Sequence, residues 1–193
     1  MKPLIVRISV TLVVAAFAML LAGCTVHVDD KDKDAKNVDI HTPLANLKVD
    51  TSAASTDNGI PVYPGATPRP EEGGDKHRAN VNLGAMGFGV KIIAAEYLTP
   101  DSPDKVKTFY LENLKKWGSV LECRGTGGDH GAIGDWNNGE GDKPVTCGDA
   151  KGDGWELKVG TRNNQRMVAI HPDGSGTRFG TALVQIHSKE GTL

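Results

Sequence analysis

One strong helix pattern, followed by strands with no second helix between them, most constrains what this chain can fold into. Ser102-Pro103-Asp104 supplies an N-cap serine, a proline at the first helical position and an acid in the first turn. Gly118 ends the pattern. One side of the predicted helix carries Val106, Phe109, Tyr110, Asn113, Leu114 and Trp117. A stripe at this spacing is typical of packing against a core.

Strand patterns surround this helix. They cover residues 81–83 and 89–99 before it, and 120–123, 155–161, 166–170 and 182–187 after it. Asn163-Asn164 predicts a hairpin turn, and residues 172–180 predict a longer glycine-rich turn. High glycine content, 24 residues, also favours strands and loops over a helical bundle. We therefore expect an α+β domain: an antiparallel sheet of about five to six strands with one main helix packed on a face.

The N-terminus has the pattern of a secretory signal. Lys2 and Arg7 precede an apolar stretch, residues 8–22, which is shorter than the ~20 residues that a membrane-spanning helix needs. The stretch ends in Leu21-Ala22-Gly23-Cys24, which resembles the lipobox of bacterial lipoproteins. That resemblance implies that residues 1–23 are a signal peptide and that Cys24 becomes the lipid-bearing first residue. The alternative is an ordinary signal peptide that ends in a cysteine by chance.

A lipid on Cys24 would anchor the protein to a membrane without spanning it, because two or three acyl chains hold a protein stably. Thr25 follows the cysteine, where aspartate would suggest retention in the inner membrane. We therefore expect a protein of the cell envelope, in the outer membrane if the cell is Gram-negative.

The rest of the chain divides into three parts. Residues 24–36 alternate Asp and Lys and predict a solvated, lipidated tether. Residues 37–58 predict a small hairpin and linker, which would dock on the main domain or form a peripheral flap. Residues 59–193 form the predicted globular domain. The hairpin places four apolar side chains on one face: Val38, Ile40, Leu47 and Val49.

Two cysteines remain, Cys123 and Cys147. The compartment beyond the membrane is oxidising, so the sequence predicts a structural disulfide between them. Free or metal-bound thiols are the alternative, but there is no CxxC pattern to favour metal.

The remaining motifs do not indicate a catalytic, metal-binding or cofactor-binding site. The glycine-rich stretch 125–141 fits neither a dinucleotide-binding nor a Walker pattern. Its Trp136 is a candidate recognition residue, unless the indole packs back onto the sheet. Asp149 and Asp153 match part of a calcium loop that lacks ligands at its third and twelfth positions. The sequence therefore predicts no catalytic residues, no metal site and no cofactor. Widely spaced histidines also lack a metal-binding pattern: His130, His171 and His187.

Several pieces of the chain resemble a family of uncharacterised bacterial secreted proteins and lipoproteins. The clearest is Pro61-Val62-Tyr63-Pro64-Gly65-Ala66, followed by a helix that contains Phe109-Tyr110. The resemblance implies the fold and the envelope location, and it carries over no catalytic residue.

The charge balance excludes a nucleic-acid partner. Without Lys2 and Arg7, 20 basic residues face 24 acidic ones, a formal charge of about −4. We expect a membrane-anchored envelope lipoprotein that acts as a non-catalytic binding or scaffold module for an envelope protein or small ligand. The alternative is a hydrolase with a site assembled from scattered residues. A hydrolase should show a histidine and a carboxylate in hydrogen-bond contact within a cleft, and a binding module should show an apolar groove.

Overall fold

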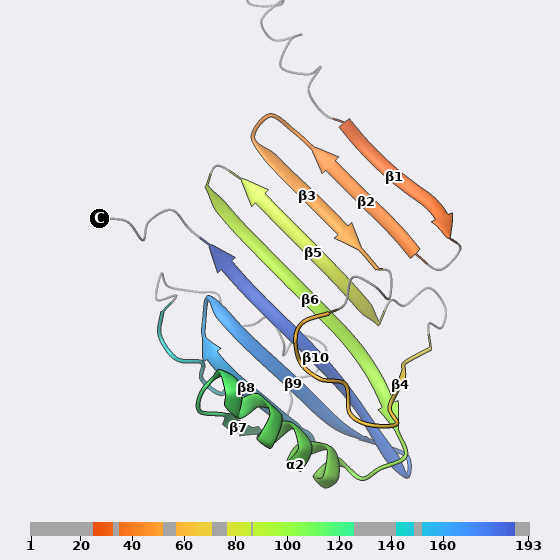
Figure 1. Ribbon diagram of the computed structural model, residues 1–193, viewed down its shortest axis with the longest axis vertical. Helices are drawn as coiled ribbons and strands as arrows, with labels where there is room; N and C mark the ends of the chain where they lie inside the picture. Colours follow the sequence, from red (N-terminus) through yellow and green to blue (C-terminus); the bar gives the residue numbers. More distant parts are fainter. Residues whose placement is uncertain are drawn as a thin grey trace, which may run out of the picture.

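The computed structural model describes residues 25–32, 35–51, 57–70, 77–85, 87–125, 142–148 and 152–187. Within these residues the chain forms one ten-stranded antiparallel sheet with one α-helix on one face (Figure 1). The strands are β1 (Thr25–Asp32), β2 (Ala35–His41), β3 (Ala45–Asp50), β4 (Thr67–Pro68), β5 (Arg78–Ala85), β6 (Phe88–Thr99), β7 (Leu121–Arg124), β8 (Trp155–Thr161), β9 (Asn164–Asp173) and β10 (Gly176–His187).

The strand order is β1-β2-β3-β5-β6-β10-β9-β8-β7, and β4 pairs with β6 beyond the end of β5. After β6 the chain forms helix α2 (Pro103–Leu114) and a short 3-10 helix, η2 (Lys115–Trp117). It then continues into β7 at the far edge of the sheet. Helix α2 therefore lies over β8, β9 and β10 (Figure 1).

The expected α+β sheet of five to six strands is wrong, because the N-terminal strands extend the main sheet. The predicted hairpin is present, with Val38 opposite Val49 and Ile40 opposite Leu47. Strand β3 then pairs along its length with β5, which places Leu47 opposite Leu83. Strand addition satisfies backbone N–H and C=O groups along the edge of a sheet, and this explains the additional strands.

The charged run that was expected as a tether begins with strand β1, which pairs with β2 from Thr25 opposite His41 to Asp32 opposite Ala35. Backbone pairing does not depend on side-chain charge, so alternating Asp and Lys residues are compatible with an edge strand. The prediction of a solvated tether was based only on the lack of apolar side chains and left backbone pairing out.

The predicted helix is confirmed, one predicted turn is shifted by a residue, and the other is tighter than expected. Helix α2 begins with Pro103 at its first position, and Gly118 follows η2 with a φ of 135°. The β8–β9 turn lies at Arg162-Asn163, one residue before the predicted pair. The long turn expected over 172–180 is a two-residue turn, because β9 and β10 pair up to Asp173 and Gly176. Gly174 there has a φ of 57°, a conformation that favours glycine.

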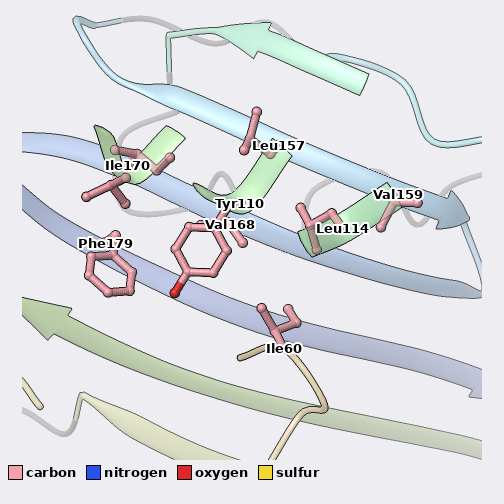
Figure 2. Close-up of a cluster of buried hydrophobic side chains, with 9 residues drawn as sticks. Ile60, Tyr110, Leu114, Leu157, Val159, Val168, Ile170 and Phe179 are labelled. Carbon is pink, nitrogen blue, oxygen red and sulfur yellow. The ribbon is translucent and has the colours of Figure 1, made fainter. Parts of the chain in front are cut away.

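The main core lies between α2 and the sheet (Figure 2). Helix α2 buries Val106, Tyr110 and Leu114, which confirms the centre of the predicted stripe. Trp117 is only half-buried. The facing core residues are Ile60, Leu157, Val159, Val168, Ile170 and Phe179.

The Pro-x-Tyr-Pro-Gly-Ala piece is part of this core structure. The backbone N–H of Tyr63 donates to the hydroxyl oxygen of Tyr110 at 3.2 Å. The ring of Tyr63 packs edge-on against Phe109, with ring centroids 5.2 Å apart. Nearby, the Asn58 amide donates to the Thr181 hydroxyl at 2.8 Å. These contacts hold the segment against the helix and the sheet, which gives the motif a packing role.

Candidate functional site

One face of the sheet is aliphatic from β1 to β10. Side chains on adjacent strands share a face when their residues are paired, and alternate residues of one strand point to opposite faces. We call the resulting surface the aliphatic face. Its first row of paired residues is Val26, Ile40, Leu47, Leu83, Val90 and Ile186. Its second row is Val38, Val49, Val81, Ile92 and Val184.

The aliphatic face is the face that α2 does not cover. Phe179 packs beneath α2, whereas Val184 and Ile186 have the opposite parity on the same strand. On the helix-covered side, β1, β2 and β3 carry polar residues. There Asp39 and His41 form an ion-pair contact of 3.0 Å between Oδ1 and Nε2. The N-terminal strands are therefore aliphatic on one face and polar on the other.

Exposure increases along the aliphatic face toward the N-terminal strands. Val184 and Met167 are 1% and 3% exposed near the centre of the sheet. The paired residues of β2 and β3 are half-buried. Val26, on the edge strand, is 63% exposed. The accessible part of this face therefore lies on β1, β2, β3 and β5.

Four exposed large hydrophobic residues gather at one end of the sheet, which we call the apolar tip. They are Val26, Leu44, Leu83 and Phe88. The start of β1, the β2–β3 turn and the β5–β6 connection lie along the same edge in Figure 1. Register confirms this, because one row crosses this end through Thr25, His41, Asn46, Gly84, Gly89 and His187.

Local sequence fixes the two connections of the apolar tip. In the β2–β3 turn, the hydroxyl of Thr42 accepts a bond from the N–H of Ala45 and donates to its carbonyl, both at 2.9 Å. This closed turn presents Leu44, which is 68% exposed. At the β5–β6 connection, Gly87 has a φ of 92°, a conformation that glycine adopts without strain. Phe88 follows it and is 42% exposed.

The structure also contains a histidine–carboxylate contact of the kind expected for a hydrolase. His77 Nδ1 lies 3.4 Å from Glu96 Oε2, and Arg69 donates to the same oxygen at 2.7 Å. The backbone N–H of Arg69 donates to the carbonyl of Glu96, and the N–H of Glu96 donates to the carbonyl of His77. These bonds join the segments around β4 and β5 to β6. The guanidinium neutralises the carboxylate, which favours a structural ion pair over a catalytic base.

A second polar group surrounds Asp101, just before α2. Its carboxylate accepts bonds from the Tyr63 hydroxyl at 2.9 Å and the Lys105 ammonium at 2.8 Å. These two donors, Lys105 first, lower the pKa of Asp101. Burial, followed by the bond to Asp101, raises the pKa of Tyr63. A tyrosine with a raised pKa stays protonated as a donor, so this group stabilises the helix start.

The predicted Cys123–Cys147 disulfide is confirmed, and the two Cα atoms lie 5.5 Å apart. It joins β7 to the segment 142–148. An unpredicted buried ion pair lies on the neighbouring strand, where Lys158 Nζ is 3.2 Å from Glu156 Oε2. Lys158 also donates to the carbonyl of Thr146 at 3.3 Å. Two opposite charges at i and i+2 of a predicted strand could have suggested this pair.

Other predicted residues are not brought together. Cys24 and Trp136 lie outside the described residues, as do His130 and Asp149. His171 lies near one end of β9, and burial lowers its pKa. His187 lies at the other end of the sheet, in the apolar tip. Among the described residues there is no group of three or more His, Cys, Asp or Glu that could hold a metal ion.

Within the described part of the chain, every helix is too short or too polar to cross a membrane. No protein-family model, curated protein or solved structure matches this chain.

Proposed function

We propose that this protein is a lipid-anchored envelope lipoprotein that acts as a non-catalytic binding or scaffold module. The observation that supports this proposal is the accessible aliphatic face of β1, β2, β3 and β5. An ordered row of aliphatic side chains offers burial to a partner, at roughly 25 cal/mol per Å² of apolar surface. It offers no acid, base or nucleophile for a reaction.

The proposed partner is an envelope protein or a small apolar ligand. The lipobox supports the location, with Cys24 acylated and the signal peptide 1–23 removed. In a Gram-negative cell the residue after the cysteine, Thr25, favours the outer membrane. The histidine–carboxylate contact at His77 and Glu96 is occupied by Arg69, and the contact between His41 and Asp39 involves exposed side chains, so hydrolysis has less support.

Lipidation is tested by Cys24→Ala. The wild type should incorporate labelled fatty acid and partition into the detergent phase, and the variant should do neither. Secretion of the variant with unchanged circular dichroism would show that the fold does not depend on the lipid. A wild-type mature chain without lipid would contradict the anchor.

Binding is tested by placing a photocrosslinking amino acid at Leu47 or at Lys48 in the intact cell. These neighbours lie on the same strand and point to opposite faces, so Lys48 is a matched control. We expect a defined crosslinked species from Leu47 and none from Lys48. Leu83→Asp, next to Leu47 across the register, should abolish the species. Equal crosslinking from both positions would contradict a partner on the aliphatic face.

A further inference from the structure

We infer that the apolar tip contacts the phospholipid bilayer that holds the anchor, with Leu44 and Phe88 entering its headgroup region. The inference rests on the proposed lipidation of Cys24. It adds an orientation: strands β1, β2, β3 and β5 stand on the membrane by one end.

The first argument is the position of the anchor in the chain. Strand β1 begins at Thr25, the residue directly after Cys24. Consecutive Cα atoms are about 3.8 Å apart, so no spacer separates the acylated residue from the sheet. A tether of a dozen residues would have allowed any orientation. A strand that starts at the anchor places its own end of the sheet at the membrane surface.

The second argument is the geometry of that end. From β1, the row through Thr25 and His41 continues across β3 and β5 to Gly89 on β6. Neighbouring strands are about 4.8 Å apart, so these five strands span roughly 19 Å. The turn with Leu44 lies along this edge (Figure 1), and Phe88 begins β6 beside Gly89 of the same row. Both lie within one sheet width of the acylated residue.

The third argument is chemistry. Among the described residues of the tip, 25–26, 41–46, 83–85 and 87–89, there is no Asp, Glu, Lys or Arg, and the contact of His41 with Asp39 lies on the opposite, polar face of the sheet. The opposite end of the sheet is charged, with Asp101, Lys105, Asp173 and Arg178. Exposed leucine and phenylalanine gain by entering the headgroup and acyl boundary, and an uncharged surface does so without desolvating an ion. The side chains of the tip are therefore more stable in the headgroup region of the bilayer than in water.

Depth measurements with spin labels test the inference. With Cys24 acylated and Cys123 bonded to Cys147, one introduced cysteine is the only free thiol. The lipidated chain would carry a nitroxide at Leu44→Cys or Phe88→Cys, in vesicles of phosphatidylethanolamine and phosphatidylglycerol. Ser175→Cys, in the β9–β10 turn, is the control. It lies about 40 Å away along the 12 residues of β10.

We expect the labels at the tip to be several-fold less accessible to a water-soluble nickel complex, and more accessible to oxygen, than the label at Ser175. Leu44→Asp should increase the nickel accessibility of a label at Phe88. Val62→Asp changes an exposed hydrophobic residue away from the tip and should leave that label shielded. The tip is exposed, so unchanged melting temperatures should accompany these variants.

Two failures are distinguishable. If the acylated protein floats with the vesicles while the labels at Leu44, Phe88 and Ser175 are equally accessible to nickel, the inference is overturned and the anchor stands. If Cys24 carries no lipid and the protein does not float, both the proposed function and this inference fail.

Discussion

The helix-packed half of the sheet and its N-terminal extension are built from the same alternating strands, yet they differ in how they are covered. In the helix-packed half, β8, β9 and β10 bury one face under α2, and on the other face β9 and β10 contribute to a smaller cluster around Met167 and Val184. In the extension, no helix of the described residues lies on β1, β2 or β3. The comparison teaches that alternating apolar and polar residues are enough to form the sheet. A main core forms only in the part of the sheet on which a helix packs.

The two regions also differ in their aromatic residues. Phe179 stacks on Tyr97 with ring centroids 5.4 Å apart and lies 5.5 Å from the ring of Tyr110. The extension instead contains half-buried valine, isoleucine and leucine. Such residues contribute less burial each, so the extension depends on the pairing of β3 with β5, which in turn pairs with β6.

The largest effect is expected from Phe179→Ala. Phe179 is fully buried at the centre of the aromatic cluster, so the variant should lose about 4 kcal/mol of unfolding free energy. Chemical denaturation would measure this loss. A loss below about 1 kcal/mol would show that the helix-packed half is not the main source of stability.

Removal of the disulfide should have a slightly smaller effect. The double variant Cys123→Ala, Cys147→Ala removes a cross-link between residues 24 apart in the sequence. In the chain-entropy description, this loss lowers the free energy of unfolding by about 3.5 kcal/mol. Denaturation of the variant and of the oxidised wild type would give the difference. The variant should still pair β1, β2 and β3, because the disulfide lies at the opposite edge of the sheet. Loss of hydrogen-exchange protection in β2 before global unfolding would contradict this independence.

Leu47→Ala, in the extension, should cost about 1 kcal/mol, because a half-buried leucine loses only part of its burial energy. Hydrogen exchange should become faster in β2 and β3 while protection in β9 is unchanged. A loss as large as that of Phe179→Ala would remove the distinction between the two regions.

The smallest effect is expected at Asp101, in the helix-packed half. Its pKa is lowered in the folded protein, so its contribution to stability is present above the ordinary carboxyl pKa. The contribution is lost as the pH falls through the lowered value. Between about pH 5 and pH 2, the melting temperature of the wild type should therefore fall more steeply than that of Asp101→Asn. Parallel curves would exclude a role for Asp101 in the acid response.

The sequence predicted local elements well and their assembly less well. The start of α2, the hairpin at Val38 and Val49, and the Cys123–Cys147 bond depend on nearby residues or on a single available pairing. The extension of the sheet depends on the register of Leu47 with Leu83, which no local pattern encodes. The apolar tip could likewise not be predicted from sequence, because Leu44 in a turn and Phe88 at the start of β6 are far apart in the chain and neither belongs to an apolar pattern.

The central position of β10 has a consequence for biogenesis. Thr99 at the end of β6 pairs with Thr177 at the start of β10, and β10 is the last strand of the described residues. A nascent chain emerges N-terminus first, so β6 presents an unpaired edge until β10 has emerged. Such an edge is prone to intermolecular pairing and aggregation. Truncation before β10 would therefore leave this edge of β6 open permanently.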